Sequence, residues 1–349
     1  MYNIKIYFED DEEMEFDCAD GEDLITASLR QEIILMSECR DGLCGTCKVL
    51  CDEGEVEHGD GVTVQSLPPE EEEEGQIIMC QAFPQSDLEL TAPYGSDRVT
   101  LGVAAPTKTY SSVIVACEEL TENVTKFVLE VQDHFEKAED FPFIAGQYVT
   151  VEVPGTEEWR SYSMANVAKK DGKIELLVRL LDDGCMSNYL RNDVKTGDGV
   201  DVKGPFGTFG LHDSGGRSRY FVAGSTGLAP LLSMVREMSE KGDTTPAHLL
   251  LGARNKDFLF YEEEIKQLES TMETLQVHIA LEDTEGCENW TGFCGNSVEM
   301  LTSLLTDNNE KPDIYICGPA GMVTAVEDAG RELEIPSKQI YLERFVASS

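Results

Sequence analysis

The chain has 349 residues, about two to three times the usual size of one domain, so more than one hydrophobic core is expected. Hydrophobic residues at 41% and charged residues at 27% are ordinary for a folded globular protein. The formal net charge of -40 excludes nucleic acid and an anionic membrane as expected direct partners.

The negative charge is unevenly spread along the chain. Residues 1–95 hold 25 acidic and 4 basic residues, a net charge of -21, whereas residues 96–349 hold 42 and 23, a net charge of -19. The first quarter is therefore expected to be a separate acidic module. No apolar run approaches the ~20 residues needed to cross a bilayer, and the first residues lack a signal-peptide pattern, so we expect a cytoplasmic protein.

The first 95 residues predict a small α+β domain. Apolar residues alternate within residues 4–8 and 14–18, on either side of an acidic turn, which predicts a β-hairpin with one buried face. Asp23 is an expected N-cap for a helix over residues 24–32. A stretch rich in Pro, Gly, Ser and Thr predicts a linker at 96–112.

The pattern changes twice after this linker. Residues 113–213 contain short β-runs broken by Gly, Pro and Asp, which predict a closed antiparallel barrel. In residues 214–349, apolar strands alternate with amphipathic helices, which is typical of a parallel, doubly wound α/β sheet. The sequence therefore predicts a chain of three domains.

Four cysteines have the spacing of a plant-type two-iron, two-sulfur site. Cys39, Cys44 and Cys47 are close together, and Cys80 follows at a distance. Small residues between them allow a tight loop whose amides can donate to sulfur. A structural zinc site and a set of free core cysteines are the alternatives, but zinc usually takes paired C-x2-C knuckles and the distant segment supplies one cysteine.

Two motifs in the predicted barrel have the chemistry of a flavin site. Arg160 opens the run R-S-Y-S on a predicted strand, with Tyr162 and Ser163 after it. Downstream, Gly184 and Ser187 lie at an expected helix start. An arginine and a helix N-terminus suit a dinucleotide pyrophosphate, an aromatic ring can stack on an isoalloxazine, and a hydroxyl can bond at the flavin N5.

Two strand-loop-helix motifs lie in the predicted parallel sheet. The run 224–230, G-S-T-G-L-A-P, places amides at a helix N-terminus where phosphate can bind, although a plain glycine turn is the alternative. The run 317–322, C-G-P-A-G-M, repeats this arrangement near the end of the chain. Cys317 is expected at the carboxyl end of a strand, facing the ligand crevice.

Together with the terminal E-R-F, these motifs resemble the ferredoxin-NADP reductase superfamily with an N-terminal plant-type ferredoxin. More narrowly, M-S-E-C-R-D-G-L-C-G-T-C-K, Q-S-L-P-P-E-E-E-E-E-G and K-G-P-F-G-T-F-G-L resemble the reductase component of soluble methane monooxygenase and of related bacterial multicomponent di-iron monooxygenases. The resemblance implies a β-grasp ferredoxin domain, an antiparallel β-barrel FAD domain and an α/β parallel-sheet NAD domain, with boundaries at 1–95, 113–213 and 214–349.

The resemblance also implies a role for each motif residue. The cluster would be held by Cys39, Cys44, Cys47 and Cys80. FAD would meet Arg160 at its pyrophosphate, Tyr162 at its ring and Ser163 at its N5 edge, with Gly184 and Ser187 at the diphosphate. NADH would be held by Gly224, Thr226 and Gly227 at its pyrophosphate and by Cys317, Gly318 and Pro319 beside the nicotinamide. Phe345 would flank the flavin, and Ser163, Cys317 and Phe345 would be the catalytic residues. The family usually has two glycines where this chain has Gly224 and Ser225.

The implied function is electron transfer from NADH through FAD and a 2Fe-2S cluster to the hydroxylase of a di-iron monooxygenase. A flavin can accept an electron pair and release it singly to a cluster. No motif of the chain resembles an oxygen-activating site, so hydroxylation is expected on the partner. The alternatives are the reductase of a Rieske aromatic-ring dioxygenase and a non-enzymatic iron-sulfur carrier. Arg254 and Lys256 could meet a 2'-phosphate, but NADH is expected over NADPH because Asp257, Glu282 and Asp283 would repel one. A solvated surface is the alternative for these charged residues.

Overall fold

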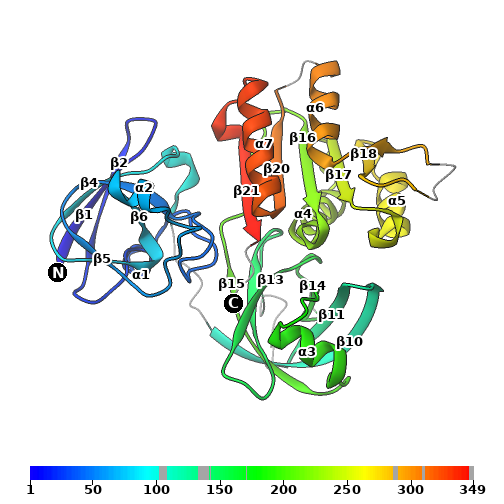
Figure 1. Cartoon of the computed structure of the whole chain (residues 1–349), viewed down its shortest axis with the longest axis horizontal. Coiled ribbons are helices and arrows are strands. Elements are labelled where there is room, and N and C mark those ends of the chain that lie inside the picture. Colours follow the sequence, from blue (N-terminus) through cyan, green and yellow to red (C-terminus); the bar gives the residue numbers. More distant parts are fainter. Residues whose placement is uncertain are drawn as a thin grey trace. The chain divides into compact units, whose positions relative to one another are not determined.

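The computed structural model describes residues 1–101, 108–132, 141, 143–169, 171–285, 290–308 and 311–345 (Figure 1). The chain folds into two compact units, Met1–Pro106 and Thr107–Ala347. The predicted linker 96–112 contains this division. Among the described residues, no helix is long and apolar enough to cross a membrane.

The first unit is built on a five-stranded sheet in the order β2-β1-β8-β4-β6. Its main strands are β1 (Tyr2–Tyr7), β2 (Glu13–Cys18), β4 (Lys48–Glu53), β6 (Gln76–Ile78) and β8 (Leu88–Thr91). Short strands form two further pairs: β3 (Ile33–Ile34) with β9 (Thr100–Leu101), and β5 (Val56–His58) with β7 (Ala82–Pro84). Two α-helices, α1 (Leu24–Arg30) and α2 (Pro69–Glu73), and two 3-10 turns, η1 (Met79–Gln81) and η2 (Ser96–Arg98), complete it.

The predicted hairpin and helix of this unit are confirmed. Ile4 pairs with Phe16 across β1 and β2, and both side chains are buried, as the alternating pattern requires. The Asp23 carboxylate accepts the Thr26 backbone N–H at 2.9 Å and so caps α1. The hairpin and the capped helix thus form part of the domain that contains the cysteine loop.

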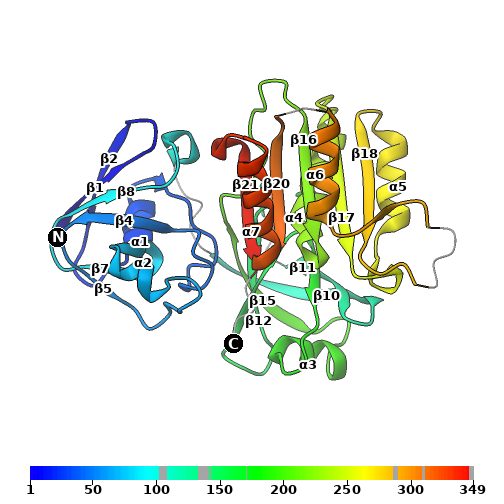
Figure 2. The same ribbon diagram turned by 45° about the horizontal axis from the view of Figure 1, so that its top comes forward.

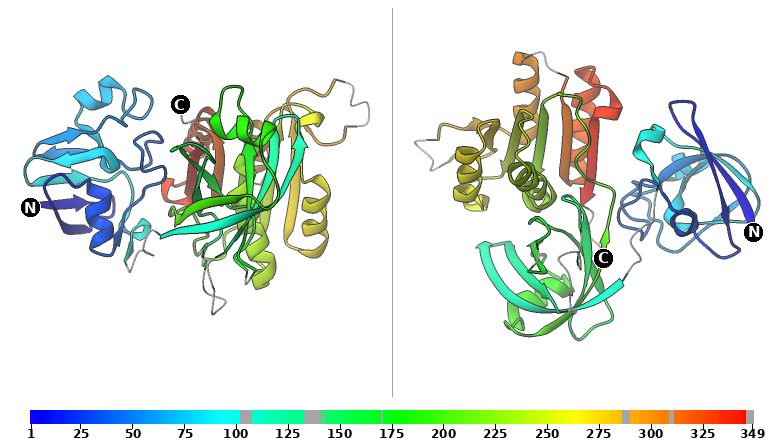
Figure 3. Two further views of the ribbon diagram at one scale, coloured as in Figure 1. Left: turned by 90° about the horizontal axis from the view of Figure 1, so that it is seen from below. Right: turned by 180° about the vertical axis from the view of Figure 1, so that it is seen from behind.

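The second unit begins with a six-stranded antiparallel sheet in the order β13-β12-β15-β10-β11-β14. Its strands are β10 (Lys108–Thr121), β11 (Val124–Val131), β12 (Tyr148–Glu152), β13 (Trp159–Ser163), β14 (Lys173–Arg179) and β15 (Gly199–Phe206). A bridge between Met164 and Leu176 joins its two ends, which closes the predicted barrel. Helix α3 (Cys185–Asn192) buries Met186 and Leu190 against the barrel core. Figure 3 shows the ribbon of both units from two further sides.

The rest of the second unit is a six-stranded parallel sheet in the order β19-β18-β17-β16-β20-β21. Its strands are β16 (Arg219–Gly224), β17 (Ala247–Ala253), β18 (Leu275–Leu281), β19 (Phe293–Cys294), β20 (Asp313–Pro319) and β21 (Ile340–Phe345). Its helices are α4 (Leu228–Lys241), α5 (Glu262–Thr271), α6 (Ser297–Asn308) and α7 (Ala320–Glu332), with 3-10 turns η3 (Ser225–Gly227), η4 (Lys256–Phe258) and η5 (Ser337–Gln339). The strand order reverses between β16 and β20, which is where ligands bind in open α/β sheets.

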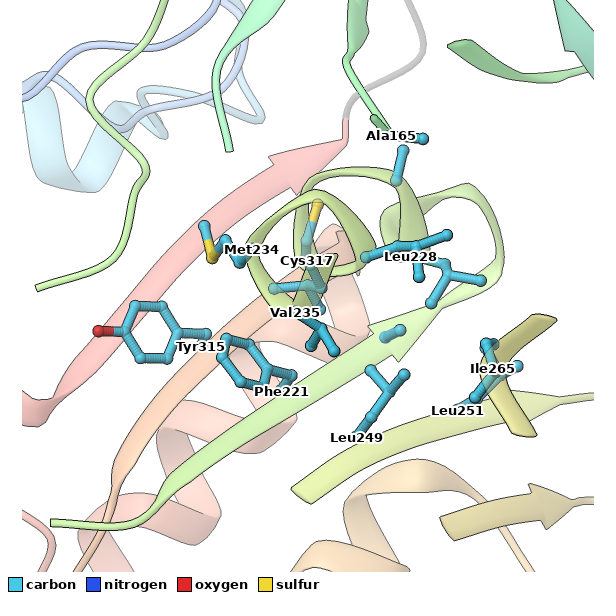
Figure 4. Close-up of a cluster of buried hydrophobic side chains, with 14 of the residues drawn as sticks. Ala165, Phe221, Leu228, Met234, Val235, Leu249, Leu251, Ile265, Tyr315 and Cys317 are labelled. Atoms are coloured by element: carbon cyan, nitrogen blue, oxygen red, sulfur yellow. The ribbon is translucent and has the colours of Figure 1, made fainter. Parts of the chain in front are cut away.

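Helices pack on this parallel sheet (Figure 2), and its two faces have separate cores. Helices α6 and α7 contribute to one core, and α4 and α5 contribute to the other. The second core also includes barrel residues such as Ala165 and Leu177, together with Phe221, Leu228 and Cys317 of the sheet side (Figure 4). The barrel and the parallel sheet therefore share apolar packing and form one unit.

Candidate functional site

The first unit brings the four predicted cluster cysteines together. Cys39 and Cys44 lie in the loop before β4, Cys47 directly precedes that strand, and Cys80 lies in η1 after β6. Antiparallel pairing of β4 with β6 places the last two close together. The backbone amide of Cys80 donates to Cys47 Sγ at 3.5 Å. Segments more than thirty residues apart in sequence thus meet at one sulfur.

The loop holding the first two cysteines also directs amides at sulfur. The backbone N–H groups of Leu43 and Cys44 donate to Cys39 Sγ at 3.4 and 3.3 Å. Gly42 has φ of +81°, and a Cβ there would lie 2.7 Å from the Gly61 carbonyl oxygen. Only glycine fits this turn without displacing the backbone. The cysteines therefore form two pairs, Cys39 with Cys44 and Cys47 with Cys80. In each pair the backbone N–H of the second cysteine donates a hydrogen bond to the sulfur of the first.

The surroundings of these thiols suit thiolate ligands of an iron-sulfur cluster. The buried Thr46 hydroxyl lies by the Cys44 thiol and can donate to its sulfur. The hydrogen bond with Cys39, together with burial, raises the pKa of the Cys44 thiol well above its ordinary value. Positive iron would offset this cost of the thiolate form.

The predicted flavin strand is β13, an outer strand of the barrel sheet. The Arg160 guanidinium donates to the Glu158 carboxylate at 2.7 Å and to the Trp159 carbonyl at 2.8 Å. Burial raises the pKa of the Tyr162 phenol above its ordinary range. Ser163 ends the strand and is 4% exposed. A charged donor, a partly buried aromatic ring and a buried hydroxyl therefore lie on one five-residue strand.

A buried carboxylate joins this strand to the parallel sheet. Glu343 on β21 is 4% exposed, and its Oε2 accepts hydrogen bonds from Ser163 Oγ at 3.0 Å and from Cys317 Sγ at 3.4 Å. Parallel pairing of β20 and β21 puts Cys317 directly opposite Glu343. The hydroxyl predicted beside the flavin and the thiol predicted beside the nicotinamide thus contact the same carboxylate.

Glu343 was missed by the sequence reasoning, which selected Phe345 from the same terminal motif. The available signal was an acidic residue that follows three apolar residues in the predicted strand I-Y-L-E-R-F. Phe345 is half-buried, packs against the core shared by barrel and sheet, and pairs in register with Pro319. It therefore lies at the carboxyl edge of the sheet, beside the predicted nicotinamide segment.

The predicted diphosphate segment forms the start of α3. Gly184 is the N-cap, and the buried Ser187 Oγ accepts the Leu181 backbone N–H at 2.9 Å. A Cβ on Gly184 would lie 2.9 Å from Ser187 Oγ, so the turn is compact. The first amides of this eight-residue helix suit a diphosphate.

The two loops of the parallel sheet pack directly against each other at the strand-order reversal. A Cβ on Gly227 would lie 2.1 Å from the Cys317 carbonyl oxygen, and one on Gly224 would lie 3.2 Å from the Pro319 ring. The α-carbon of Gly224 is one of the nearest atoms to a Cβ built on Gly318, at 3.3 Å. The two loops are so close that only glycines fit between them. The N-termini of α4 and α7, which follow these loops, lie at the same carboxyl edge of the parallel sheet. The residues present therefore fit a dinucleotide pyrophosphate.

Ser225, which stands where the family usually has glycine, adopts a backbone conformation typical of glycine. Its φ is +53°, in the left-handed region that glycine adopts without strain. The neighbouring Thr226 is buried, with 6% of its surface exposed. The chain thus keeps the turn geometry at this position with a serine in place of glycine.

The acids expected to disfavour a 2'-phosphate lie at the same edge. The backbone N–H of Asp283 donates to the Arg254 carbonyl at 2.7 Å, and that of Glu282 donates to the Ala253 carbonyl at 3.2 Å. The ends of β17 and β18 are thereby joined, which places these acids beside the run that contains Arg254.

Three protein-family models match the chain in the predicted order. A 2Fe-2S iron-sulfur cluster binding domain matches residues 7–85, an oxidoreductase FAD-binding domain matches 111–210, and an oxidoreductase NAD-binding domain matches 221–328. The three cofactors implied by the motifs, the 2Fe-2S cluster, FAD and NADH, are therefore confirmed. The alternative of a non-enzymatic iron-sulfur carrier is not supported.

Curated relatives match over nearly the whole chain. Methane monooxygenase component C of Methylosinus trichosporium is 44% identical over 86% of this chain and 84% of its own. The reductase component of phenol 2-monooxygenase from Pseudomonas sp. (strain CF600) is 31% identical over 95% and 91%. The electron transfer component of toluate 1,2-dioxygenase from Pseudomonas putida is 30% identical over 100% and 99%.

Solved structures of similar proteins share the fold. A cytochrome P450 reductase from Amycolatopsis superposes with a TM-score of 0.76 at 25% identity, covering 99% of this chain and 100% of its own. The ferredoxin reductase of a carbazole 1,9a-dioxygenase has a TM-score of 0.69 at 24% identity and covers 99% of both chains. With its three cofactor domains and these relatives, the chain belongs to the ferredoxin-fused, NADH-dependent flavoprotein reductase components of bacterial multicomponent oxygenases.

Proposed function

We propose that this reductase passes electrons from NADH through FAD and its 2Fe-2S cluster to the hydroxylase of a di-iron monooxygenase of the methane or alkane type. The observation that carries the proposal is the contact of Ser163 and Cys317 with one buried carboxylate, because it joins the predicted flavin strand to the predicted nicotinamide strand. The 44% identity to a methane monooxygenase component supports the choice of acceptor.

The motif residues keep the roles that the resemblance implies. In the barrel, Arg160 and the α3 amides near Gly184 and Ser187 bind the FAD diphosphate. Tyr162 lies on the flavin ring and Ser163 at its N5 edge. These positions agree with the burial of Ser163 and with the helix N-terminus at Gly184.

In the parallel sheet, the proposed NADH site uses the two packed loops. Gly224, Thr226 and Gly227 bind the pyrophosphate through backbone amides. Cys317, Gly318 and Pro319 border the nicotinamide, and Phe345 flanks the flavin. The close approach of Gly227 to the Cys317 carbonyl supports a common site for both loops.

The chain's own residues orient the two redox groups and exclude water between them. Bound FAD supplies the conversion from a two-electron hydride to single electrons for the cluster. Glu343 holds the Ser163 hydroxyl and the Cys317 thiol in fixed directions, in a region where all three side chains are buried. Buried hydrogen bonds of this kind keep a donor at a defined position without reorganisation.

If electrons pass from NADH to FAD and only then to the cluster, Cys80→Ser should affect the second step and spare the first. NADH-driven reduction of a dye should continue, because flavin reduction does not require the cluster, whereas reduction of the hydroxylase should be lost. The measurement is steady-state turnover with each acceptor, together with the FAD content of the variant. Loss of both activities with FAD still bound would contradict this route.

The acceptor class is tested by reconstitution. A di-iron hydroxylase and a Rieske dioxygenase are each mixed with the reductase and NADH, and product formation is followed. The second acceptor is the alternative that the toluate dioxygenase relative favours. Faster turnover with the Rieske protein would overturn the proposed acceptor.

Three further parts of the proposal concern the whole chain. We place its domains at 1–95, 113–213 and 214–349, with a linker at 96–112. Its proposed location is the cytoplasm, where NADH is available. Nucleic acid is not a proposed partner, because the net charge of -40 opposes binding to a polyanion.

A further inference from the structure

A buried arginine connects the barrel to the parallel sheet away from the cofactor motifs. Arg236 lies on α4, and its side chain is 15% exposed. Its Nη1 donates to the Ala165 carbonyl at 2.6 Å and to Glu175 Oε1 at 2.9 Å, both in the barrel. Its Nη2 pairs with Glu264 on α5. One guanidinium therefore joins the barrel to two helices of the parallel-sheet domain.

Glu175 of β14 is the acceptor at the centre of this network. Besides Arg236, it accepts the Tyr261 phenol O–H at 2.9 Å and lies 3.7 Å from Lys126 Nζ on β11. Tyr261 directly precedes α5 and has φ of +61°, and burial raises its pKa above the ordinary range. The phenol therefore stays protonated and donates to the carboxylate. We call Glu175, Arg236 and Tyr261 the clasp.

Each barrel atom held by the clasp lies near the predicted flavin strand. Ala165 follows Ser163 by two residues, and its backbone N–H donates to the Glu175 carbonyl at 2.8 Å. The next residue, Asn166, accepts the Ser233 hydroxyl of α4 at 2.7 Å through its carbonyl. Figure 4 shows Ala165 over helix α4. The segment that follows the predicted flavin strand is thus hydrogen-bonded to α4 through Ala165 and Asn166.

The sheet side of the clasp lies on the two segments predicted to hold NADH. Helix α4 begins directly after Gly227, so Arg236 and the pyrophosphate loop are on one rigid element. Tyr261 follows the run 254–260, which leaves the carboxyl end of β17. The clasp therefore fixes both segments to the barrel at positions that neither cofactor is predicted to touch.

The shared apolar core alone does not define this orientation. Apolar contacts are non-directional, so the two domains could rotate slightly and still bury similar area. Hydrogen bonds from a planar guanidinium require defined directions, and a mostly buried charge that loses its partner is destabilising. The clasp thus penalises rotation of the parallel sheet against the barrel.

We propose that Glu175, Arg236 and Tyr261 are positioning residues that set the distance between nicotinamide and flavin for hydride transfer. The inference rests on the proposed NADH and FAD sites. Hydride transfer needs close approach of the reacting atoms, and a small misplacement is enough to slow it. The clasp should therefore affect the rate of transfer within the bound complex, with little effect on the affinity for either cofactor.

The test is single-turnover reduction of the FAD-loaded full chain by NADH, followed anaerobically by flavin absorbance. Three variants weaken the clasp to different degrees: Arg236→Met, Arg236→Lys and Tyr261→Phe. Lys241→Met is the matched control, since Lys241 is an exposed cation at the far end of the same helix. Limiting rate, half-saturating NADH concentration and FAD content are measured for each.

We expect Arg236→Met to lower the limiting rate about tenfold, with Arg236→Lys and Tyr261→Phe in between and the control at the wild-type rate. Half-saturating NADH and FAD content should stay within about twofold of wild type, which a general loss of structure would not allow. An unchanged limiting rate in Tyr261→Phe and Arg236→Lys would overturn the clasp, even if Arg236→Met fails to fold. If wild type is not reduced by NADH, the proposed function itself fails.

Discussion

At the scale of single residues, the most informative side chain is Glu343. A carboxylate that is 4% exposed is costly to bury, and this one is stabilised by donors from a barrel strand and a sheet strand. Ser163 lies 180 residues away in the sequence. The contact therefore exists only because the two domains fold as one unit.

Removing either half of this contact should slow flavin reduction. Ser163→Ala deletes the hydroxyl, and Glu343→Gln keeps the size of the side chain while deleting its charge. Each should lower the rate of reduction by NADH about ten- to hundredfold while FAD binding changes less. Rapid-mixing reduction and FAD titration measure the two effects. Asp328→Asn, an exposed acid of α7, is the control, and unchanged kinetics in both variants would remove the assigned role.

Residue patterns were sufficient to predict that the four cysteines lie together, but not to predict Glu343. The cysteine spacing is local, so three of the four ligands follow from one loop. Strand ends likewise predicted that Cys317 faces the crevice. A carboxylate whose partners come from two other strands has no such local signature, and its place after the apolar run I-Y-L was the only hint.

At the scale of elements, the contact between the loops after β16 and β20 is the tightest part of the nucleotide edge. Gly227→Ala would place a methyl group 2.1 Å from the Cys317 carbonyl oxygen, so one loop must move. We expect half-saturating NADH to rise about tenfold or more in single-turnover reduction.

Gly242→Ala separates this effect from a general glycine effect. Gly242 ends α4 with φ of +64°, and nothing lies within 4 Å of its added Cβ. The variant should lose about 1 kcal/mol of unfolding free energy from the left-handed backbone yet keep wild-type reduction by NADH. Equal kinetic effects in the two variants would argue against a special role for Gly227.

Strands β17 and β18 carry a histidine pair that makes stability depend on pH. His248 Nδ1 and His278 Nε2 are 3.1 Å apart, and burial lowers the pKa of His278. Above the unfolded-state pKa of ~6.5 both forms of the chain have a neutral ring. As pH falls through this value, the unfolded chain takes up the proton first, so the unfolding free energy decreases until the lower folded pKa is passed.

The pH effect is measured by denaturant unfolding of wild type and His278→Gln between about pH 7.5 and pH 5.5. The wild-type protein should lose stability toward the acid end more steeply than the variant. Parallel pH profiles would show that this pair does not carry the dependence.

Elements with strong periodicity were predictable, and short ones were not. The hairpin, the capped helix, the barrel strands and the strand-helix alternation follow from local apolar spacing. Helix α2 was missed because its five residues P-E-E-E-E bury nothing and have no apolar period. The two-stranded pairs β3 with β9 and β5 with β7 were also missed, since pairing between distant short segments is decided by the fold around them.

At the scale of the whole molecule, the uneven charge is expected to affect electron delivery to the hydroxylase more than hydride transfer from NADH to flavin. Residues 1–95 carry a net charge of -21, and this module presents the cluster to another protein. Acidic surface can steer a basic docking face, and salt screens such attraction over ~8 Å at physiological ionic strength. A generally acidic composition is the competing explanation, and the net charge of -19 on the remaining residues is in line with it.

Added salt should therefore slow electron delivery to the hydroxylase while NADH-to-flavin transfer changes little. Rapid-mixing rates for both steps, taken over a series of KCl concentrations, measure the difference. A similar salt dependence for the two steps would favour the general explanation over docking.

The apolar core common to barrel and parallel sheet has a consequence for how such chains arise. Ala165 and Leu177 of the barrel are buried in the core that also contains the α4 side chains, so either half alone would lose part of its apolar cover. The cysteine-bearing unit has its own closed core and ends at Pro106. Recombination can therefore attach, exchange or relocate it near this residue, which would let evolution change the electron acceptor while the hydride chemistry is kept.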